Sequence, residues 1–146
     1  VGFANLFGWI LITERLPQWL SGEILSFSQN KYVVLLLINL LLLFFGTFME
    51  TVAALLILFP ILLKVAMSVG VDPIHFAVIA VLNLVIGLTT PPVGVCLFVA
   101  SSIGKISIGE ISKASLPFLL ISFAILALVT LIPELSLFLP SLFLDK

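Results

Sequence analysis

The feature that most constrains this chain is a pair of prolines, Pro91 and Pro92, inside an otherwise apolar run over residues 74–103. Each proline lacks a backbone N–H, and Pro92 forces Pro91 out of the helical region of backbone angles, so a helix arriving from residue 74 must stop before them. Gly94 lets the chain turn before a second helix begins. The sequence therefore predicts two short helices, over 74–88 and 95–103.

Neither predicted helix is long enough to cross a membrane by itself. They rise roughly 22 Å and 14 Å, whereas a hydrocarbon core is about 30 Å thick, a distance the two together can cover. This favours one membrane helix broken at mid-depth over a tight surface turn between two helices. Broken backbone at that depth must be buried in protein or line a cavity, which is typical of transporter binding sites.

The composition agrees with a membrane protein. Of 146 residues, 62% are hydrophobic and 9% charged, with a mean hydropathy of +1.42, whereas soluble domains carry about 25% charged residues. A net charge of −1 argues against nucleic acid as a partner. The sequence shows no metal-spaced His/Cys set and no catalytic motif, so it does not indicate an enzyme. The start, without Met or a signal peptide, suggests the interior of a longer protein.

A second interruption divides the apolar runs 33–45 and 51–69. The separating segment is Gly46-Thr-Phe-Met-Glu50, and Pro60 is expected to kink the second run. The first run rises only about 20 Å, which favours a re-entrant hairpin with its tip inside the bilayer. In the alternative, both helices span the membrane and the tip is a surface turn.

The flanking segments supply the rest of the predicted architecture. Residues 1–12 indicate the end of a membrane helix, and 13–32 either an amphipathic interfacial helix anchored by Trp19 or a polar loop. Gly70 should end the hairpin, with Asp72 as N-cap of the next helix. The predictions for the C-terminal part are a polar link, a final span and an apolar tail lying on the protein or the membrane, over 105–113, 114–132 and 135–144.

The break supplies groups that could bind ions. The carbonyl groups that end the first half-helix, together with the Thr89 and Thr90 hydroxyls, suit a cation, and without a carboxylate cluster they suit Na⁺ better than a divalent metal. The free amides that follow Gly94 suit the oxygens of an anion. The hairpin tip offers the same kinds of groups, namely the carbonyls that end its first arm and the amides that begin its second arm.

Several polar side chains remain open to two interpretations. Glu50 at membrane depth indicates a functional acid, but it also fits a capping box that begins at Thr47. Asn39 and Asn83 are expected to make hydrogen bonds between helices. His75 is expected to be a capping or interfacial residue rather than a metal ligand, and the single cysteine, Cys96, a small apolar packing residue.

An ordered series of motifs resembles the large membrane subunit of TRAP (tripartite ATP-independent periplasmic) transporters. The match runs over most of the chain from about residue 33, and the motifs are Gly46-Thr-Phe-Met-Glu50, Ala53-Ala54, Pro60-Ile-Leu-Leu63, Gly70-Val-Asp-Pro-Ile-His-Phe76, Asn83-Leu-Val-Ile-Gly-Leu-Thr-Thr-Pro-Pro-Val-Gly94, Leu97-Phe-Val-Ala100, Ile132-Pro-Glu-Leu-Ser136 and Leu139-Pro140. The resemblance implies an all-α membrane protein, the second inverted repeat of an elevator-type ion transporter. Residues 1–32 would end a membrane helix and form an arm helix, 33–104 would hold the hairpin (33–69) and broken helix (74–103), and 105–146 the final transmembrane helix and tail.

The same resemblance implies Na⁺-coupled uptake of an organic acid, of the sialic acid or C4-dicarboxylate type, across the bacterial inner membrane. Its partners would be the first repeat of the large subunit, a small membrane subunit, a periplasmic substrate-binding protein and membrane lipid, with Na⁺ as the transported ion. The expected Na⁺ site consists of Gly46, Thr47, Thr89, Thr90 and Gly94. The expected substrate contacts are Glu50, Thr51 and Pro92. A channel and a purely scaffolding subunit are the alternatives.

Overall fold

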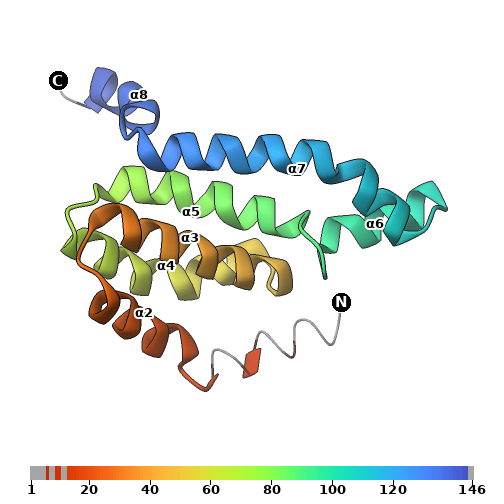
Figure 1. Cartoon of the computed structure of the whole chain (residues 1–146), viewed down its shortest axis with the longest axis horizontal. Coiled ribbons are helices and arrows are strands. Elements are labelled where there is room, and N and C mark those ends of the chain that lie inside the picture. The colour runs from red at the N-terminus through yellow and green to blue at the C-terminus, as the bar shows by residue number, and fades with distance from the viewer. Residues whose placement is uncertain (1–5, 7–8, 11–12, 145–146) are drawn as a thin grey trace.

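The computed structural model describes residues 6, 9–10 and 13–144, and the architecture is helical (Figure 1). The elements are α2 (Leu16–Phe27), α3 (Lys31–Phe48), α4 (Thr51–Ser68), α5 (Pro73–Leu88), α6 (Val95–Gly104), α7 (Ile108–Leu131) and α8 (Glu134–Leu144). In the described part of the chain, three helices are long and apolar enough to cross a membrane: α3, α4 and α7. α5 and α6 are shorter, as the proline pair predicts.

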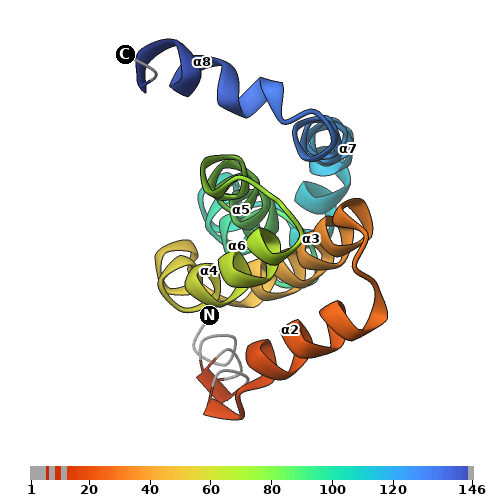
Figure 2. The ribbon, with the colours of Figure 1, turned by 90° about the vertical axis from the view of Figure 1, so that its left-hand side faces the viewer.

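The helices form a bundle around α5. α3 and α4 make an antiparallel hairpin that packs on α5, while α7 runs back along α5 and α6 and contacts both (Figure 1). α2 crosses the outer side of α3 and α4, and α8 projects away from the bundle (Figure 2). The hairpin, the first half-helix α5 and α7 therefore share one core, to which the second half-helix α6 contributes no residue.

Local signals fix several helix boundaries as predicted. Asp72 caps α5, because its carboxylate accepts hydrogen bonds from the backbone amides of Ile74 and His75, and Pro73 occupies the first turn. Gly70, just after the end of α4, adopts the left-handed conformation, with a φ of 81°. Both predictions are confirmed.

Two helices are longer than expected. α3 continues to Phe48 as 18 residues, about 27 Å, because Gly46 and Thr47 extend the helix instead of interrupting it. The argument that the first arm of the hairpin is too short to span a membrane was therefore wrong. α7 begins at Ile108 rather than Ala114, since Ser107 and Glu110 form a capping box that starts the helix within the predicted polar link.

The ends of the chain are helical where the structure describes them, so that of the two alternatives for residues 13–32 the helix is observed and not the polar loop. The predicted tail is the helix α8, which leaves large apolar side chains such as Phe138 and Phe143 exposed. Within the predicted interfacial segment, α2 covers Leu16–Phe27 and exposes Trp19. Most of the prediction for residues 1–12 lies outside the described residues.

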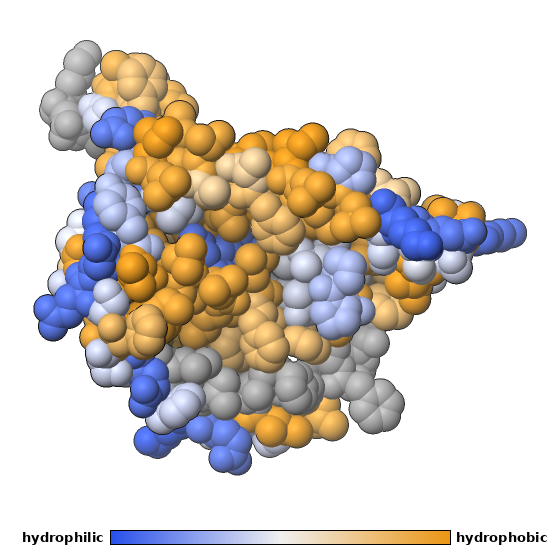
Figure 3. Space-filling model, in the orientation of Figure 1, coloured by the Kyte–Doolittle hydropathy of each residue, from blue (hydrophilic) through white to orange (hydrophobic). Residues whose placement is uncertain are grey.

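The surface is apolar over much of its length. Figure 3 shows hydrophobic residues over the middle of the molecule and hydrophilic ones gathered toward its two ends. Exposed apolar side chains such as Leu36, Leu56 and Leu120 lie on α3, α4 and α7. This distribution suits helices that face lipid or further membrane helices.

Candidate functional site: the hairpin tip and the helix break

The predicted helix break is present and close to its predicted limits. α5 ends at Leu88 and α6 begins at Val95. Gly94 has a φ of 48°, and a Cβ built on it would lie 2.9 Å from the Leu97 side chain and 3.1 Å from the backbone oxygen of Thr90. The connection therefore turns tightly at Gly94, where a larger residue would be strained and crowded.

The break lies beside the middle of α7. A cavity of about 290 Å³ is lined by Thr89 at the end of α5 together with Ser115, Phe118, Leu119 and Ser122. These four residues belong to the central turns of the 24-residue helix, which is about 36 Å long. The chain is thus interrupted part-way along a helix that is long enough to cross a membrane.

The hairpin tip reaches α5 just before the break. A Cβ built on Gly87 would lie 2.8 Å from both the Cα and the carbonyl carbon of Gly46. A Cβ built on Gly46 would lie 3.3 Å from backbone atoms of Leu84. The last turns of α3 and α5 are therefore in direct backbone contact, which places the two predicted halves of the ion site on adjoining helix ends.

The threonine hydroxyl groups are oriented by their own helices. Thr89 and Thr90 both donate to the backbone oxygen of Ile86, at 2.9 and 2.8 Å. Thr47 donates to the backbone oxygen of Phe44 at 2.8 Å. Since each hydroxyl hydrogen is engaged, the lone pairs of the three oxygens remain to accept a hydrogen bond or to bind a cation.

Two helices begin at this region, and their N-termini differ. The carboxylate of Glu50 caps α4 and accepts hydrogen bonds from the backbone amides of Val52 and Ala53, at 2.9 and 3.0 Å. These two hydrogen bonds stabilise the charged form of the Glu50 carboxylate. At α6, Gly94 provides no side-chain cap, so the first amides of that helix have no carboxylate of this kind.

The capping-box prediction for Glu50 was wrong in its register. It required Thr47 to be the N-cap, but Thr47 lies within the last turn of α3 and Glu50 itself is the N-cap of α4. The helix starts later because α3 runs through Gly46 and Thr47. Glu50 has a structural role at this position, and its side chain is exposed at the tip.

The predicted substrate residues lie around the tip and the connection. Pro92 is exposed, and Thr51 is half-buried in the first turn of α4. The Thr51 hydroxyl oxygen is buried without a hydrogen-bond partner among the described residues. In the part of the chain that the structure describes, no hydrogen bond joins Glu50, Thr51 or Pro92 to the three threonines.

A polar chain crosses the bundle below the tip. The Asn83 side-chain amide donates to the backbone oxygen of Asn39 at 3.0 Å and to its side-chain oxygen at 2.6 Å. Asn39 donates in turn to the Thr130 hydroxyl of α7 at 3.1 Å. The prediction that both asparagines bond between helices is confirmed.

Two further side chains depart from their predicted surroundings. His75, whose backbone is capped by Asp72 as expected, is buried, and its ring contacts the Ser136 hydroxyl of α8 instead of facing an interface. Cys96 is exposed on α6, so its prediction as a packing residue was wrong for the described chain. No three His, Cys, Asp or Glu side chains of the described residues gather at a metal-binding distance.

Sequence reasoning missed one residue of this region, Gly87. Its position four residues after Asn83 places both on the same face of α5. Small residues on one helix face, beside a polar residue that bonds across helices, are a known signal of close helix packing in membranes. That signal was present in the sequence.

The sequence that forms the break and the tip lies within a match to a known protein family. The model of the family described as "Tripartite ATP-independent periplasmic transporter, DctM component" matches residues 1–135. This chain belongs to the DctM component family. The match extends to residue 1, and so includes the first 32 residues, which carried the weakest resemblance in the sequence.

Relatives of this DctM-family chain include proteins named for different substrates. The sialic acid TRAP transporter large permease protein SiaM of Vibrio cholerae is 52% identical over 140 residues, which are 96% of this chain and 33% of that protein. The isethionate TRAP transporter permease protein DctMQ of Oleidesulfovibrio alaskensis is 45% identical, over 94% of this chain and 22% of that protein. The C4-dicarboxylate TRAP transporter large permease protein DctM of Pseudomonas aeruginosa is 44% identical, over 94% of this chain and 32% of that protein. The chain thus spans about a third or less of the length of these relatives.

Proposed function

We propose that the large permease containing this chain carries out Na⁺-coupled uptake of an organic acid across the bacterial inner membrane. A periplasmic binding protein would deliver the substrate, and a small membrane subunit would complete the complex. The single observation that supports a transport site most is the helix break beside the middle of α7, with the hairpin tip packed against it. Irregular backbone at such a depth needs a cavity or a ligand to satisfy it.

The cation half of the site would be formed by oxygen atoms of the tip and the break. Thr47, Thr89 and Thr90 present hydroxyl oxygens whose hydrogens are already engaged. Gly46 lies against backbone atoms of Leu84 and Gly87, and Gly94 lies close to the Thr90 backbone oxygen, with no side chain of their own in the way. A set of neutral oxygen ligands at a helix C-terminus suits a monovalent cation.

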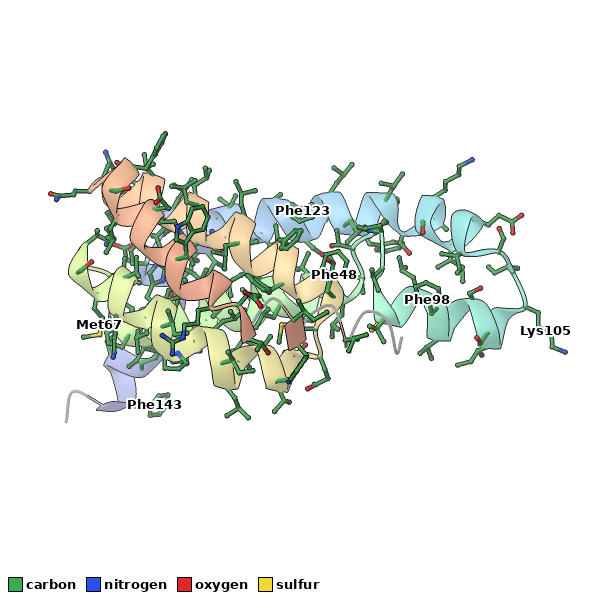
Figure 4. All side chains as sticks on the ribbon, turned by 90° about the horizontal axis from the view of Figure 1, so that it is seen from below. Phe48, Met67, Phe98, Lys105, Phe123 and Phe143 are labelled. Atoms are coloured by element: carbon green, nitrogen blue, oxygen red, sulfur yellow. The ribbon has the colours of Figure 1, made fainter. Side chains whose placement is uncertain are left out.

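The anion half would be the open N-terminus of α6. Its first amides have no side-chain cap, and the positive end of the helix dipole favours a carboxylate or sulfonate. The basic residue Lys105 follows α6 as its C-cap, at the opposite end from these amides (Figure 4). The substrates for which the relatives are named, sialic acid, isethionate and C4-dicarboxylate, are anions at neutral pH, as this site would require.

Glu50, Thr51 and Pro92 would border the substrate. Glu50 fixes the shape of the tip by capping α4, and the unpartnered Thr51 hydroxyl would bond a polar group of the substrate. In this proposal, the tip and the break move as one body relative to a fixed scaffold, and α3 and α4 form a re-entrant hairpin. Bound Na⁺ would order both elements, so Na⁺ and substrate would raise each other's affinity.

Uptake by the complete complex in proteoliposomes tests this function. Radiolabelled sialic acid, succinate and isethionate are each supplied with the matching binding protein, with and without an imposed Na⁺ gradient. We expect one of the three to accumulate only with the gradient. The combined substitution Thr89→Val and Thr90→Val should abolish the Na⁺ dependence.

The matched control is Ser26→Ala, which removes an exposed hydroxyl that donates to the Glu23 backbone oxygen of its own helix, α2, outside the tip and the break. It should leave uptake unchanged. Uptake that is indifferent to Na⁺ in the unmodified complex would refute the coupling. Na⁺ dependence that survives the double substitution would refute the assignment of the site.

A further inference from the structure

We propose that the contact between Gly46 and Gly87 determines which monovalent cation the site accepts, by setting the gap between its two halves. This inference rests on the proposed function, because it assigns a cation-selecting role within that same site. It differs from the ligand assignment, since Gly87 is not proposed as a ligand. Gly87 is a positioning residue that acts through the distance between α3 and α5.

The contact leaves no room for a side chain on α5. A Cβ on Gly87 would meet the Cα and carbonyl carbon of Gly46 at 2.8 Å and its carbonyl oxygen at 3.1 Å. These are backbone atoms of a buried helix end, which cannot swing aside as the tip of a long side chain can. Adding a side chain to Gly46 instead would crowd the contact less, because a Cβ on Gly46 would meet its nearest atoms at 3.3 Å.

The proposed cation ligands lie within one helical turn of this contact. Thr47 follows Gly46 directly on α3. On α5, Ile86 precedes Gly87, and the Ile86 backbone oxygen holds both the Thr89 and the Thr90 hydroxyl. Any change in the separation of the two helices at Gly87 is therefore passed to the ligand oxygens on both sides.

The asparagine pair fixes the register of the same two helices. Asn83 lies four residues before Gly87, and Asn39 lies seven residues before Gly46, so each pair shares one face of its helix. The two hydrogen bonds from Asn83 to Asn39 oppose sliding or rotation of α3 against α5. With the register fixed, the glycine contact alone sets how closely the helix ends approach.

An alanine at position 87 must widen this gap. Two carbon atoms pack at roughly 3.5 Å or more, so the helix ends would separate by about 0.7 Å from the 2.8 Å that the built Cβ shows. A wider oxygen cage holds a small cation less well and tolerates a larger one better. We therefore expect Gly87→Ala to weaken Na⁺ binding and to raise the affinity for K⁺ relative to Na⁺.

Equilibrium binding of radiolabelled sodium to the purified complete complex tests this without any knowledge of the substrate. Li⁺ and K⁺ serve as competitors. Gly87→Ala should lower Na⁺ affinity by about tenfold or more, and K⁺ should compete better relative to Na⁺ than in the unmodified complex. Gly46→Ala should shift both quantities in the same direction by a smaller amount. Gly109→Ala is the control, since a Cβ built on this glycine of α7 has nothing within 4 Å.

The cation ratio separates positioning from simple loss of structure, because a partly unfolded fraction lowers the number of sites but leaves the preference between cations unchanged. Unchanged Na⁺ affinity and unchanged cation ratios in a folded Gly87→Ala complex would overturn the inference while leaving the proposed function intact. If Gly87→Ala does not fold, Gly46→Ala decides by the same two quantities. Absence of Na⁺ binding in the unmodified complex would overturn the proposed function and this inference together.

Discussion

Asn83 on α5 donates its side-chain amide to both oxygens of Asn39 on α3, at 3.0 and 2.6 Å, from a position with no exposed surface. The pair joins the first arm of the hairpin to the first half of the broken helix. Because Asn39 also bonds Thr130, the helices α3, α5 and α7 meet at one polar point. In an apolar bundle, such a point specifies one register among many that packing alone would allow.

The first prediction concerns the free energy of this pair. Hydrogen bonds between membrane helices contribute about 0.6 kcal/mol on average and up to about 1.7 kcal/mol. A double-mutant cycle with Asn39→Ala and Asn83→Ala should therefore give a coupling free energy of about 1 kcal/mol for unfolding of the detergent-solubilised large subunit. Asn30→Ala, which removes an exposed N-cap of α3, should be additive with Asn83→Ala. A coupling indistinguishable from zero would contradict the structure of this pair.

The second prediction separates charge from capping at Glu50. The structure makes Glu50 the N-cap of α4, a position that Asn and Asp occupy well and Ala does not. Glu50→Asn should keep the helix start while removing the charge, and Glu50→Ala should remove both. If the carboxylate borders the substrate, both variants lose uptake, but only Glu50→Ala also loses thermal stability.

The outcome for Glu50→Asn is the informative one. Full uptake by this variant would show that the charge has no part in transport and that capping is its whole role. Glu50→Asp serves as the control, since it retains the cap and the charge. Circular dichroism and thermal unfolding of each purified variant show whether α4 still forms.

The third prediction concerns the turn before α6. Gly94 has a φ of 48° and is crowded by Leu97 and the Thr90 oxygen, so Gly94→Ala combines backbone strain with a clash. Strain of this kind costs of the order of 1–3 kcal/mol. We expect reduced stability and weaker Na⁺ binding, because the displaced Thr90 belongs to the proposed cation site. Gly109→Ala, at a glycine of α7 where an added Cβ has nothing within 4 Å, is the control and should leave both quantities unchanged.

Much of this fold could be predicted because the deciding signals are local. Two adjacent prolines end a helix wherever they stand, and Asp72 followed by Pro73 begins one. The interhelical role of Asn39 and Asn83 followed from the cost of an unpaired amide among apolar side chains. These features depend little on what the rest of the chain does.

The failures at the hairpin tip share one physical cause, which is that the sequence does not distinguish a glycine in a loop from a glycine in a tight packing contact. Gly46 was interpreted as the interruption between two runs, but it is helical and buried because Gly87 packs against it. That error shortened the predicted first arm and moved the predicted cap from Glu50 to Thr47. Only the tertiary contact distinguishes a glycine that interrupts a helix from one that allows two helices to pack closely.

The last prediction tests whether the break lies in water at membrane depth. Cys96 is the single cysteine of this sequence, and it is exposed in the first turn of α6, two residues after Gly94. A thiol facing lipid stays un-ionised and does not meet a charged, membrane-impermeant reagent, whereas a thiol in an aqueous cavity does. In a complex whose other cysteines have been replaced, Cys96 should therefore react with such a reagent.

Ligands should then protect the thiol. If Na⁺ orders the break and the substrate carboxylate sits on the first amides of α6, either should slow labelling of Cys96, and the two together should slow it most. A cysteine introduced at Val99, exposed on the same helix about one turn further along, is the control for access to α6 in general, and its labelling should depend less on the ligands. Labelling of Cys96 that is absent under all conditions would place the break away from water. Labelling that is rapid and indifferent to Na⁺ and substrate would place it in water without a binding site.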